Sequence, residues 1–181
     1  MTLGCKHYGC QNIRRLRKID FRPTVETDLD FVIQNEHDPG NSGFISQWTR
    51  EEHLQTMSDA QIAHWIIESN NDNRRIGHLI VRGVGSLDRA IELKRIAISS
   101  REHGRGFGRE TVRLLKRVAF ERWKAHRLYL DVMESNTRAQ QLYLSEGFVK
   151  EGLLRETLRH GEKYVSLVLM SILEDEYKAC T

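Results

Sequence analysis

The strongest constraint on the fold lies between residues 89 and 125, where a strand pattern, a glycine-rich loop and a helix pattern follow one another. The run RAIELKRIAIS has the alternation of a strand. The run FGRETVRLLKRVAFERWKA has one apolar helical face, formed by Thr111, Leu114, Leu115, Val118 and Ala119. Between the two runs, glycine occupies every second position, at Gly104, Gly106 and Gly108. This order predicts a strand that leads through a bare loop into a helix N-terminus.

The apolar residues of that strand change parity part-way along it. Ile91 and Leu93 are apolar at odd positions, whereas Ile96 and Ile98 are apolar at even ones, on the other side of the pair Lys94-Arg95. One explanation is a β-bulge at this pair, because one extra residue moves the following side chains to the other face. The other is a strand that is buried on both faces. Bulges are common beside active sites, so the first explanation has a functional implication.

The rest of the chain alternates between strand and helix patterns. We expect strands at residues 19–23, 61–69, 74–84, 127–133, 148–155 and 164–173, with the second and third forming a hairpin. We expect helices at residues 24–38 with Thr24 as N-cap, at 49–60 with a Thr49/Glu52 capping box, and at 137–145. The predicted fold class is α/β, a single domain at residues 18–177 with a mixed sheet and packed helices. Residues 1–17 are expected to form a flexible N-terminal extension.

Composition excludes several classes of protein. The chain has 181 residues and a formal net charge of +3, without an apolar run near the ~20 residues that a membrane span needs. We find no pattern of a secretory signal and expect a cytoplasmic protein with reduced thiols at Cys5, Cys10 and Cys180. The segment Cys5–Cys10 is half of a zinc pattern without a second ligand pair, so we predict no metal. Nucleic-acid binding by the basic stretch Arg14–Lys18 is a minor alternative.

The glycine loop favours a phosphate ligand. A helix N-terminus presents unpaired N–H groups and a partial positive charge, and glycine lets a bulky anion approach the backbone. Arg105 and Arg109 add positive charge. The alternative is a flexible strand-to-helix turn, which ordinarily needs one glycine. The loop lacks the final spacing of a dinucleotide fingerprint and the Gly-Lys-Ser/Thr ending of a P-loop, so a different pyrophosphate ligand is required.

Two segments resemble one known family. IELKRIAISSREHGRGFGRETVRLL is similar to the strand, pyrophosphate loop and helix of the GNAT superfamily of acetyl-CoA-dependent N-acetyltransferases. NTRAQQLYLSEGF matches that superfamily's later motif N-x-x-A-x-x-L-Y-x-x-x-G-F at six positions: Asn136, Ala139, Leu142, Tyr143, Gly147 and Phe148. Further segments resemble the ribosomal-protein and polyamine acetyltransferase branch. The resemblance implies a mostly antiparallel sheet of six to seven strands, splayed at the middle strands and flanked by about four helices.

The resemblance also implies a cofactor site. The family's phosphate loop, Gln/Arg-x-x-Gly-x-Gly/Ala, falls on His103, Gly104, Arg105, Gly106, Phe107 and Gly108, followed by Arg109. His103 departs from the pattern, which implies weaker or pH-dependent binding because a histidine lacks the fixed charge or the amide. The strand segment Ile96, Ala97 and Ile98 is implied to pair with the acetyl and pantetheine amides. Asn136 is implied to contact the pantetheine arm, alongside an ordinary role as an N-cap.

Two residues are candidates for the chemistry. Tyr143 resembles the family's proton donor to the leaving thiolate, with a packed core aromatic as the alternative. Glu92 falls where several relatives keep a carboxylate base, often acting through water, with a charged residue on a solvent face as the alternative. The base is needed because an amine with a pKa near 10.4 is almost entirely protonated at pH 7.

The predicted reaction is transfer of acetyl from acetyl-CoA to a primary amine, on a small polyamine, an aminated metabolite or a protein N-terminus, by a possible homodimer. The main alternative is an acyl-CoA-binding module without catalysis. Five acidic residues of the first helical region are either an attractive surface for the amine or a solvated helix face: Glu26, Asp28, Asp30, Glu36 and Asp38.

Overall fold

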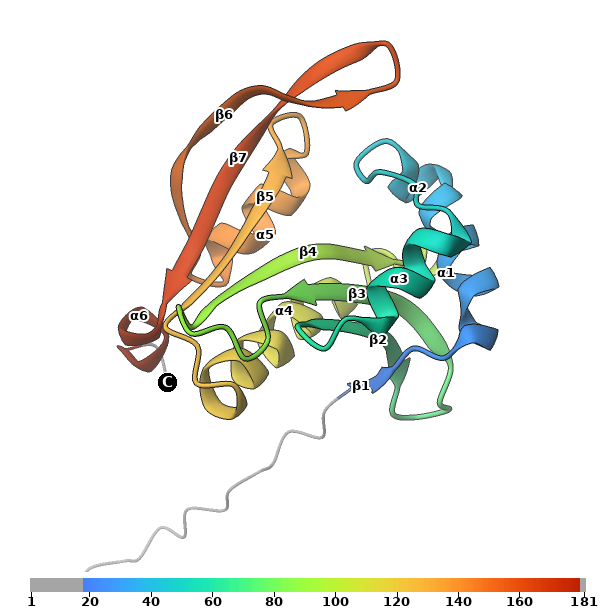
Figure 1. The fold of residues 1–181 in the computed structure, drawn as a ribbon, viewed down its shortest axis with the longest axis horizontal. Helices are drawn as coiled ribbons and strands as arrows, with labels where there is room; N and C mark the ends of the chain where they lie inside the picture. The colour runs from blue at the N-terminus through green and yellow to red at the C-terminus, as the bar shows by residue number, and fades with distance from the viewer. Residues whose placement is uncertain (1–17, 180–181) are drawn as a thin grey trace, which may run out of the picture.

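A seven-stranded mixed sheet forms the centre of the molecule in the computed structural model, which describes residues 18–179 (Figure 1). The spatial order is β1-β2-β3-β4-β5-β7-β6. β4 and β5 pair in parallel, and the other neighbouring strands pair antiparallel. The strands are β1 (Ile19–Pro23), β2 (Ile62–Ser69), β3 (Arg75–Arg82), β4 (Ala90–Ile98), β5 (Arg127–Met133), β6 (Val149–His160) and β7 (Lys163–Leu173). The predicted α/β class and mixed sheet are confirmed.

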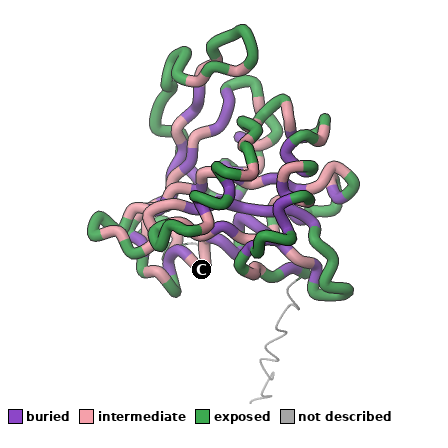
Figure 2. The backbone as a smooth tube through the Cα atoms, turned by 45° about the vertical axis from the view of Figure 1, so that its right-hand side comes forward, coloured by how far each residue is buried: buried purple, intermediate pink, exposed green. Residues whose placement is uncertain are grey.

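Helices cover both faces of this sheet. α4 (Phe107–Arg117) and α5 (Thr137–Ser145) pack on one face and share its buried apolar cluster. α1 (Leu29–His37) and α3 (Arg50–Ser58) cover the opposite face of β2, β3 and β4 (Figure 1). The short elements are η1 (Glu26–Asp28), α2 (Pro39–Ser42), η2 (Ser100–Glu102), η3 (Val118–Arg122) and α6 (Glu174–Ala179). Figure 2 shows buried residues concentrated in the central strands, whereas the far end of the β6–β7 hairpin is exposed.

The parity change in β4 is a β-bulge. Val81 pairs with Leu93 and Ile80 pairs with Arg95, so Lys94 is the extra residue. The four apolar residues on the two sides of the bulge, Ile91, Leu93, Ile96 and Ile98, consequently contribute to the same apolar core. Arg95 instead points to the face covered by α1, where it is buried. The predicted bulge is confirmed. The strand is also buried on both faces, as the alternative states, because Arg95 and Ala97 are buried on the face opposite the apolar core, but the register shows that the bulge causes the parity change.

β4 and β5 separate beyond their first residues. Their parallel pairing is limited to three residue pairs, the last of which joins Glu92 to Tyr129. Both strands continue past this point, β4 to Ile98 and β5 to Met133, and they diverge in Figure 1. Because the backbone groups of the two strands no longer pair there, the divergence leaves a gap at the middle of the sheet. The predicted splay of the middle strands is confirmed.

Four local predictions need correction. Thr24 is not a helix N-cap, because its hydroxyl contacts Nδ1 of buried His64 at 2.9 Å and the helical turn begins after Val25. The helix predicted over 107–125 is α-helical only to Arg117 and continues as a π-helical turn. α2 was not predicted; Asp38 caps it by accepting a hydrogen bond from the Gly40 backbone N–H at 2.8 Å. β6 extends to residue 160, beyond the predicted end at 155.

The other predicted elements are confirmed within a few residues, including the capping box of α3, in which the Thr49 side chain accepts from the Glu52 N–H and the Glu52 carboxylate accepts from the Thr49 N–H. The predicted N-terminal extension and the candidate half zinc site Cys5–Cys10 lie outside the described residues. Among residues 18–179, no helix is long and apolar enough to cross a membrane.

Candidate active site

The glycine loop after β4 adopts the conformation that its sequence predicts. Gly104 and Gly106 have φ angles of 76° and 86°, in the left-handed region that favours glycine. Gly106 is the N-cap of α4, and a side chain at either glycine would extend into open space. Gly108 lies in the first turn, where an added Cβ would be 3.5 Å from Leu142. The loop thus presents bare backbone and the unpaired N–H groups of a helix N-terminus to one side of the molecule.

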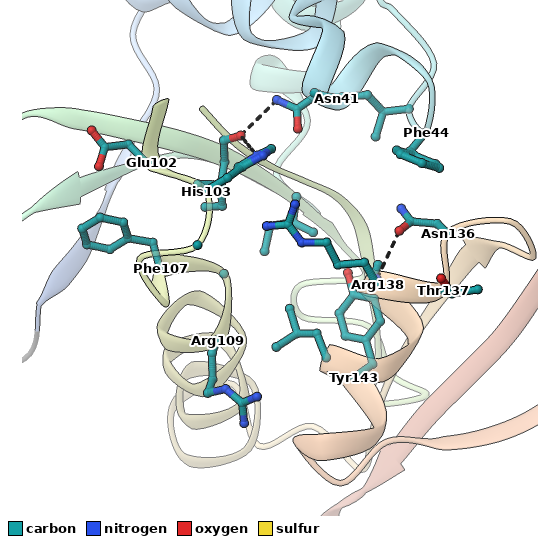
Figure 3. Close-up of a pocket in the computed structure, with 18 of the residues that line it drawn as sticks. Asn41, Phe44, Glu102, His103, Phe107, Arg109, Asn136, Thr137, Arg138 and Tyr143 are labelled. Atoms are coloured by element: carbon teal, nitrogen blue, oxygen red, sulfur yellow. Dashed lines mark hydrogen bonds between the residues drawn. The ribbon is translucent and has the colours of Figure 1, made fainter. Parts of the chain in front are cut away.

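A cleft of about 500 Å³ lies beside this loop, between the ends of β4, α2, α4 and α5. We call it the larger cleft. Figure 3 shows its side chains converging from these elements. Ten of the twelve predicted cofactor residues line it: Ile96, Ile98, His103, Gly104, Gly106, Phe107, Gly108, Arg109, Asn136 and Tyr143. Arg105 and Ala97 do not line it. The open space at the two left-handed glycines and the size of the cleft fit an extended ligand with a pyrophosphate.

His103 is engaged within the protein. Its Nε2 donates to the carbonyl oxygen of Ile98 at 2.9 Å, and the same oxygen accepts from Nδ2 of Asn41 at 3.0 Å (Figure 3). His103 and Ile98, both predicted to bind the cofactor, therefore contact each other. Asn41 attaches α2 to the end of β4. The Ser100 hydroxyl adds a second attachment by donating to Asp38 at 2.6 Å. A phosphate-binding role of His103 stays a prediction.

The arginines of the loop differ in their partners. Arg105 pairs with Glu102 at 2.7 Å, and Arg109 pairs with Glu146 at 3.1 Å. Arg138, on the first turn of α5, extends into the larger cleft in Figure 3 and has no ion pair within residues 18–179. Arg138 was not predicted as a site residue, because it occupies a variable position of the motif N-x-x-A. It is the cation most available to an anionic ligand in this cleft.

A second cleft, of about 160 Å³, opens where β4 and β5 diverge. We call it the smaller cleft. Nine of its fifteen lining residues are apolar: Phe44, Ile45, Leu93, Ile96, Val132, Met133, Ala139, Leu158 and Leu167. Its polar lining consists of Ser46, Lys94, Arg95, Asp131, Asn136 and Tyr143. Six residues line both clefts, and Asn136 and Tyr143 are the two polar ones, so the polar groups at the junction of the clefts come from these residues.

Tyr143 has the properties of a protonated hydroxyl at this junction. The residue is only 5% exposed, and burial raises the pKa of its hydroxyl well above the ordinary value. Its side chain points into the larger cleft in Figure 3, and no described residue hydrogen bonds to its hydroxyl. Asn136 caps α5 by accepting from the Ala139 N–H at 3.1 Å, which leaves its amide N–H₂ for other partners. Its predicted N-cap role is confirmed.

Glu92, the predicted base, lies farther from the clefts than Tyr143 does. Glu92 lies at the point where β4 and β5 separate, 3.5 Å from Nζ of Lys94, and lines neither cleft. Asp131, which the sequence analysis missed, does line the smaller cleft and has no ion pair or hydrogen bond with any residue between 18 and 179. Leu130 and Val132 face the apolar core, so the alternation of β5 directs Asp131 to the face of the sheet that α1 covers.

The five acidic residues of the first helical region do not gather around either cleft. Asp28 is buried, and its hydrogen bonds to Arg22 lower the pKa of its carboxyl to about 2. Asp30 pairs with Arg50, and Glu26 lies 3.9 Å from the same arginine. Asp38 accepts from Ser100 and Gly40. The two predicted alternatives, an amine-attracting surface and a solvated face, are therefore both wrong for the buried Asp28.

Glu36 is also buried, at the centre of a polar network under α1. Its carboxylate contacts Arg95, His78 at 3.2 Å and the Trp48 backbone N–H at 3.0 Å, and His53 at 3.5 Å. Burial opposes ionisation, but the contacts with His53 and His78 and the charge of Arg95 outweigh it, so the pKa of Glu36 lies far below its usual range. The network joins the bulge in β4 to Trp48, whose ring lies 4.0 Å from the Arg95 guanidinium. Within residues 18–179, no group of His, Cys, Asp and Glu side chains has a geometry that would hold a metal ion.

Comparison with known proteins decides the family. The model of the Acetyltransferase (GNAT) family matches residues 13–148. The chain belongs to the GNAT acetyltransferase family. It is an acetyl-CoA-dependent N-acetyltransferase, and the left-handed glycines and the larger cleft fit acetyl-CoA as its co-substrate.

Solved structures of spermidine N-acetyltransferase SpeG from Vibrio cholerae have the same fold as this GNAT protein. Its complex with CoA and spermine has a TM-score of 0.79 and 23% identity, over 89% of this chain and 98% of that chain. A chimera of that enzyme with hSSAT gives the same values. A dodecameric form in an intermediate state has a TM-score of 0.75 and 24% identity, over 88% and 96% of the two chains. These TM-scores establish a shared fold.

Proposed function

We propose that this GNAT enzyme transfers acetyl directly from acetyl-CoA to a primary amine where the two clefts meet. The observation that carries the proposal is that Tyr143 and Asn136 line both clefts. The larger cleft has the phosphate loop at one end, and the smaller cleft provides a separate entrance for an acceptor. The acceptor is a small polyamine, an aminated metabolite or a protein N-terminus.

The reaction needs two proton movements. The amine nitrogen forms a bond to the acetyl carbonyl carbon, the bond from that carbon to the CoA sulfur breaks, and the nitrogen loses a proton. The departing thiolate takes one proton from the Tyr143 hydroxyl. The raised pKa of Tyr143 keeps this hydroxyl protonated at neutral pH, and its freedom from partners among the described residues leaves it available as a donor. A positioned acid of this kind contributes about 10²–10⁴-fold to the rate.

Glu92 accepts the proton of the amine through a water molecule in this proposal, because the residue lines neither cleft. We expect Glu92→Gln to lower kcat by about 10²-fold. A variant with unchanged kcat would instead assign the proton transfer to another group, and Asp131 is the carboxylate that lines the smaller cleft.

Release of free thiol from acetyl-CoA, measured with a panel of primary amines, tests the function. We expect amine-dependent thiol release and an equal amount of acetylated amine by mass spectrometry. Binding of acetyl-CoA without turnover for any amine would contradict the proposal and support the alternative, an acyl-CoA-binding module.

Self-association is a further part of the proposal. β6 lies at the edge of the sheet and exposes Val149, Leu153 and Leu154, which favours a homodimer. Sedimentation measurements would detect it, and a monomer at micromolar concentration would contradict it. A cytoplasmic location stays a prediction from the sequence.

A further inference from the structure

The smaller cleft restricts the chemistry of the acceptor that the proposed function leaves open. Its volume is about 160 Å³. A cavity of about 150 Å³ lined by aliphatic side chains is large enough to bind benzene, so this space suits an apolar group of roughly that size. Nine of its fifteen lining residues are apolar, and they come from β4, β5, β6, β7, α5 and the segment after α2.

Of the three charged residues that line the smaller cleft, only Asp131 is unpaired in the described part of the chain. Arg95 is neutralised by Glu36, and Lys94 lies 3.5 Å from Glu92. Asp131 is the remaining charged residue of the lining, and no described residue pairs with it. One unpaired carboxylate beside apolar side chains complements one ammonium group, because a second buried cation there would be unpaired.

Four carboxylates of the first helical region are not free to bind further cations. Glu26, Asp28, Asp30 and Glu36 are occupied by arginines of the protein itself, as described above. The β6–β7 segment that contributes Leu158 is cationic on balance between residues 155 and 163. It carries Arg155, Arg159 and Lys163 against Glu156 and Glu162. A polycation extending out of the cleft would meet this excess of positive charge.

We propose that the acceptor is a primary amine with one cationic centre attached to an apolar body, and that Asp131 binds its ammonium group. The inference rests on the proposed function, since it identifies the substrate class of the same site. The apolar body occupies the smaller cleft beside Leu93, Val132 and Leu167, and the amine lies between Asp131 and Tyr143, which both line this cleft.

The test compares three acceptors at saturating acetyl-CoA: 2-phenylethylamine, with one cation and a ring; ethanolamine, with one cation and no apolar body; and spermidine, with three cations. We expect kcat/KM for 2-phenylethylamine to exceed the other two values by at least about tenfold. A preference for spermidine would overturn this inference while leaving the proposed function intact. Absence of thiol release with every amine, despite binding of acetyl-CoA, would overturn both.

One variant and one matched control test the role of Asp131. Asp131→Asn is expected to lower kcat/KM for 2-phenylethylamine by about 10–100-fold, mainly through KM, with the KM for acetyl-CoA unchanged. Asp30→Asn removes the same charge from an exposed pair outside both clefts and should change neither value by more than about twofold. Equal effects of the two variants would overturn the assignment.

Ile45→Asp provides a measurement that does not depend on the stability of the Asp131 variant. Ile45 lies in the segment between α2 and α3 and lines both clefts, so a carboxylate there adds a negative charge to the apolar lining. We expect a tenfold or greater fall in kcat/KM for 2-phenylethylamine and a smaller ratio between it and spermidine. An unchanged ratio would count against the proposed class of acceptor.

Discussion

The two clefts that meet at Tyr143 are built in different ways. The larger cleft depends on backbone conformation over a short stretch of sequence, with left-handed glycines between β4 and α4. The smaller cleft depends on side chains that are distant in sequence, and its floor is held by the buried contact between Glu36 and Arg95. A ligand site of the first kind can lose affinity without loss of folding. In the second kind, the residues that shape the site also stabilise the fold.

The largest effect on stability is expected from the Glu36–Arg95 contact. Glu36→Gln keeps the shape of the side chain but leaves the Arg95 guanidinium, which is 4% exposed, without a counter-ion. Removing one partner of a buried ion pair costs about 3–5 kcal/mol. We expect a loss of this size in the free energy of unfolding, measured with urea.

The control for this prediction is the exposed pair of Asp30 with Arg50, where Asp30→Asn should cost no more than about 1 kcal/mol. Equal losses of unfolding free energy in Glu36→Gln and Asp30→Asn would contradict the claim that the buried ion pair stabilises the fold under the smaller cleft. A double variant with Glu36→Leu and Arg95→Met should recover much of the stability, because an apolar pair avoids the unpaired charge.

Acid should destabilise the side of the sheet under α1. Burial lowers the pKa of His64 to about 3 and also lowers the pKa of His78. In the unfolded chain these groups have a pKa near 6.5, so the unfolded state binds more protons between pH 6.5 and pH 3. The stability that the neutral buried histidines contribute is complete above about pH 6.5. Below this pH, the free energy of unfolding falls by about 1.4 kcal/mol per pH unit for each such histidine.

Urea unfolding between pH 7 and pH 5 measures this effect, and His64→Gln should reduce the slope. An unchanged slope in this variant would mean that His64 is protonated in the folded protein. Glycine substitutions in the phosphate loop should leave the same slope unaltered, because that loop lies outside the histidine network.

The phosphate loop should give the smallest change in stability and a clear change in affinity. Gly106→Ala places a Cβ on a residue with a φ of 86°, which costs about 1–2 kcal/mol. The strain is relieved by altering the N-terminus of α4, so we expect the KM for acetyl-CoA to rise about tenfold.

Gly108→Ala is the matched variant. Gly108 lies within the α-helix and its added Cβ would make an ordinary contact with Leu142, so the higher helix propensity of alanine should stabilise the fold by up to about 1 kcal/mol. Thermal unfolding separates the two variants. A greater loss of stability in Gly108→Ala would contradict the geometry of the loop.

The same contrast explains which features the sequence predicted. The bulge at Lys94 and the left-handed glycines follow from local patterns, because strand alternation and positive φ angles leave a direct signal in residue type. The N-cap of α5 and ten residues of the larger cleft were predicted by motif.

The smaller cleft gave no comparable signal. Asp131 alternates in β5 like any polar strand residue, and only the divergence of β4 and β5 makes its carboxylate part of a site. Thr24 has the residue type of an N-cap, but a contact with His64 forty residues away determines its place. In the sequence, Glu36 looks like a solvent-exposed helix residue. Its burial follows from its ion pair with Arg95, which the bulge in β4 directs toward α1. Such contacts depend on the whole fold.

The central claim is that acetyl transfer takes place where the two clefts meet, with Tyr143 as proton donor. Its most direct test is the turnover of Tyr143→Phe beside the control Tyr164→Phe, whose tyrosine is exposed and lines neither cleft. We predict that Tyr143→Phe lowers kcat by about 10²–10⁴-fold with little change in the KM for acetyl-CoA, while the control stays within about twofold. An unchanged kcat in Tyr143→Phe would contradict the account and leave Tyr143 as a packing residue.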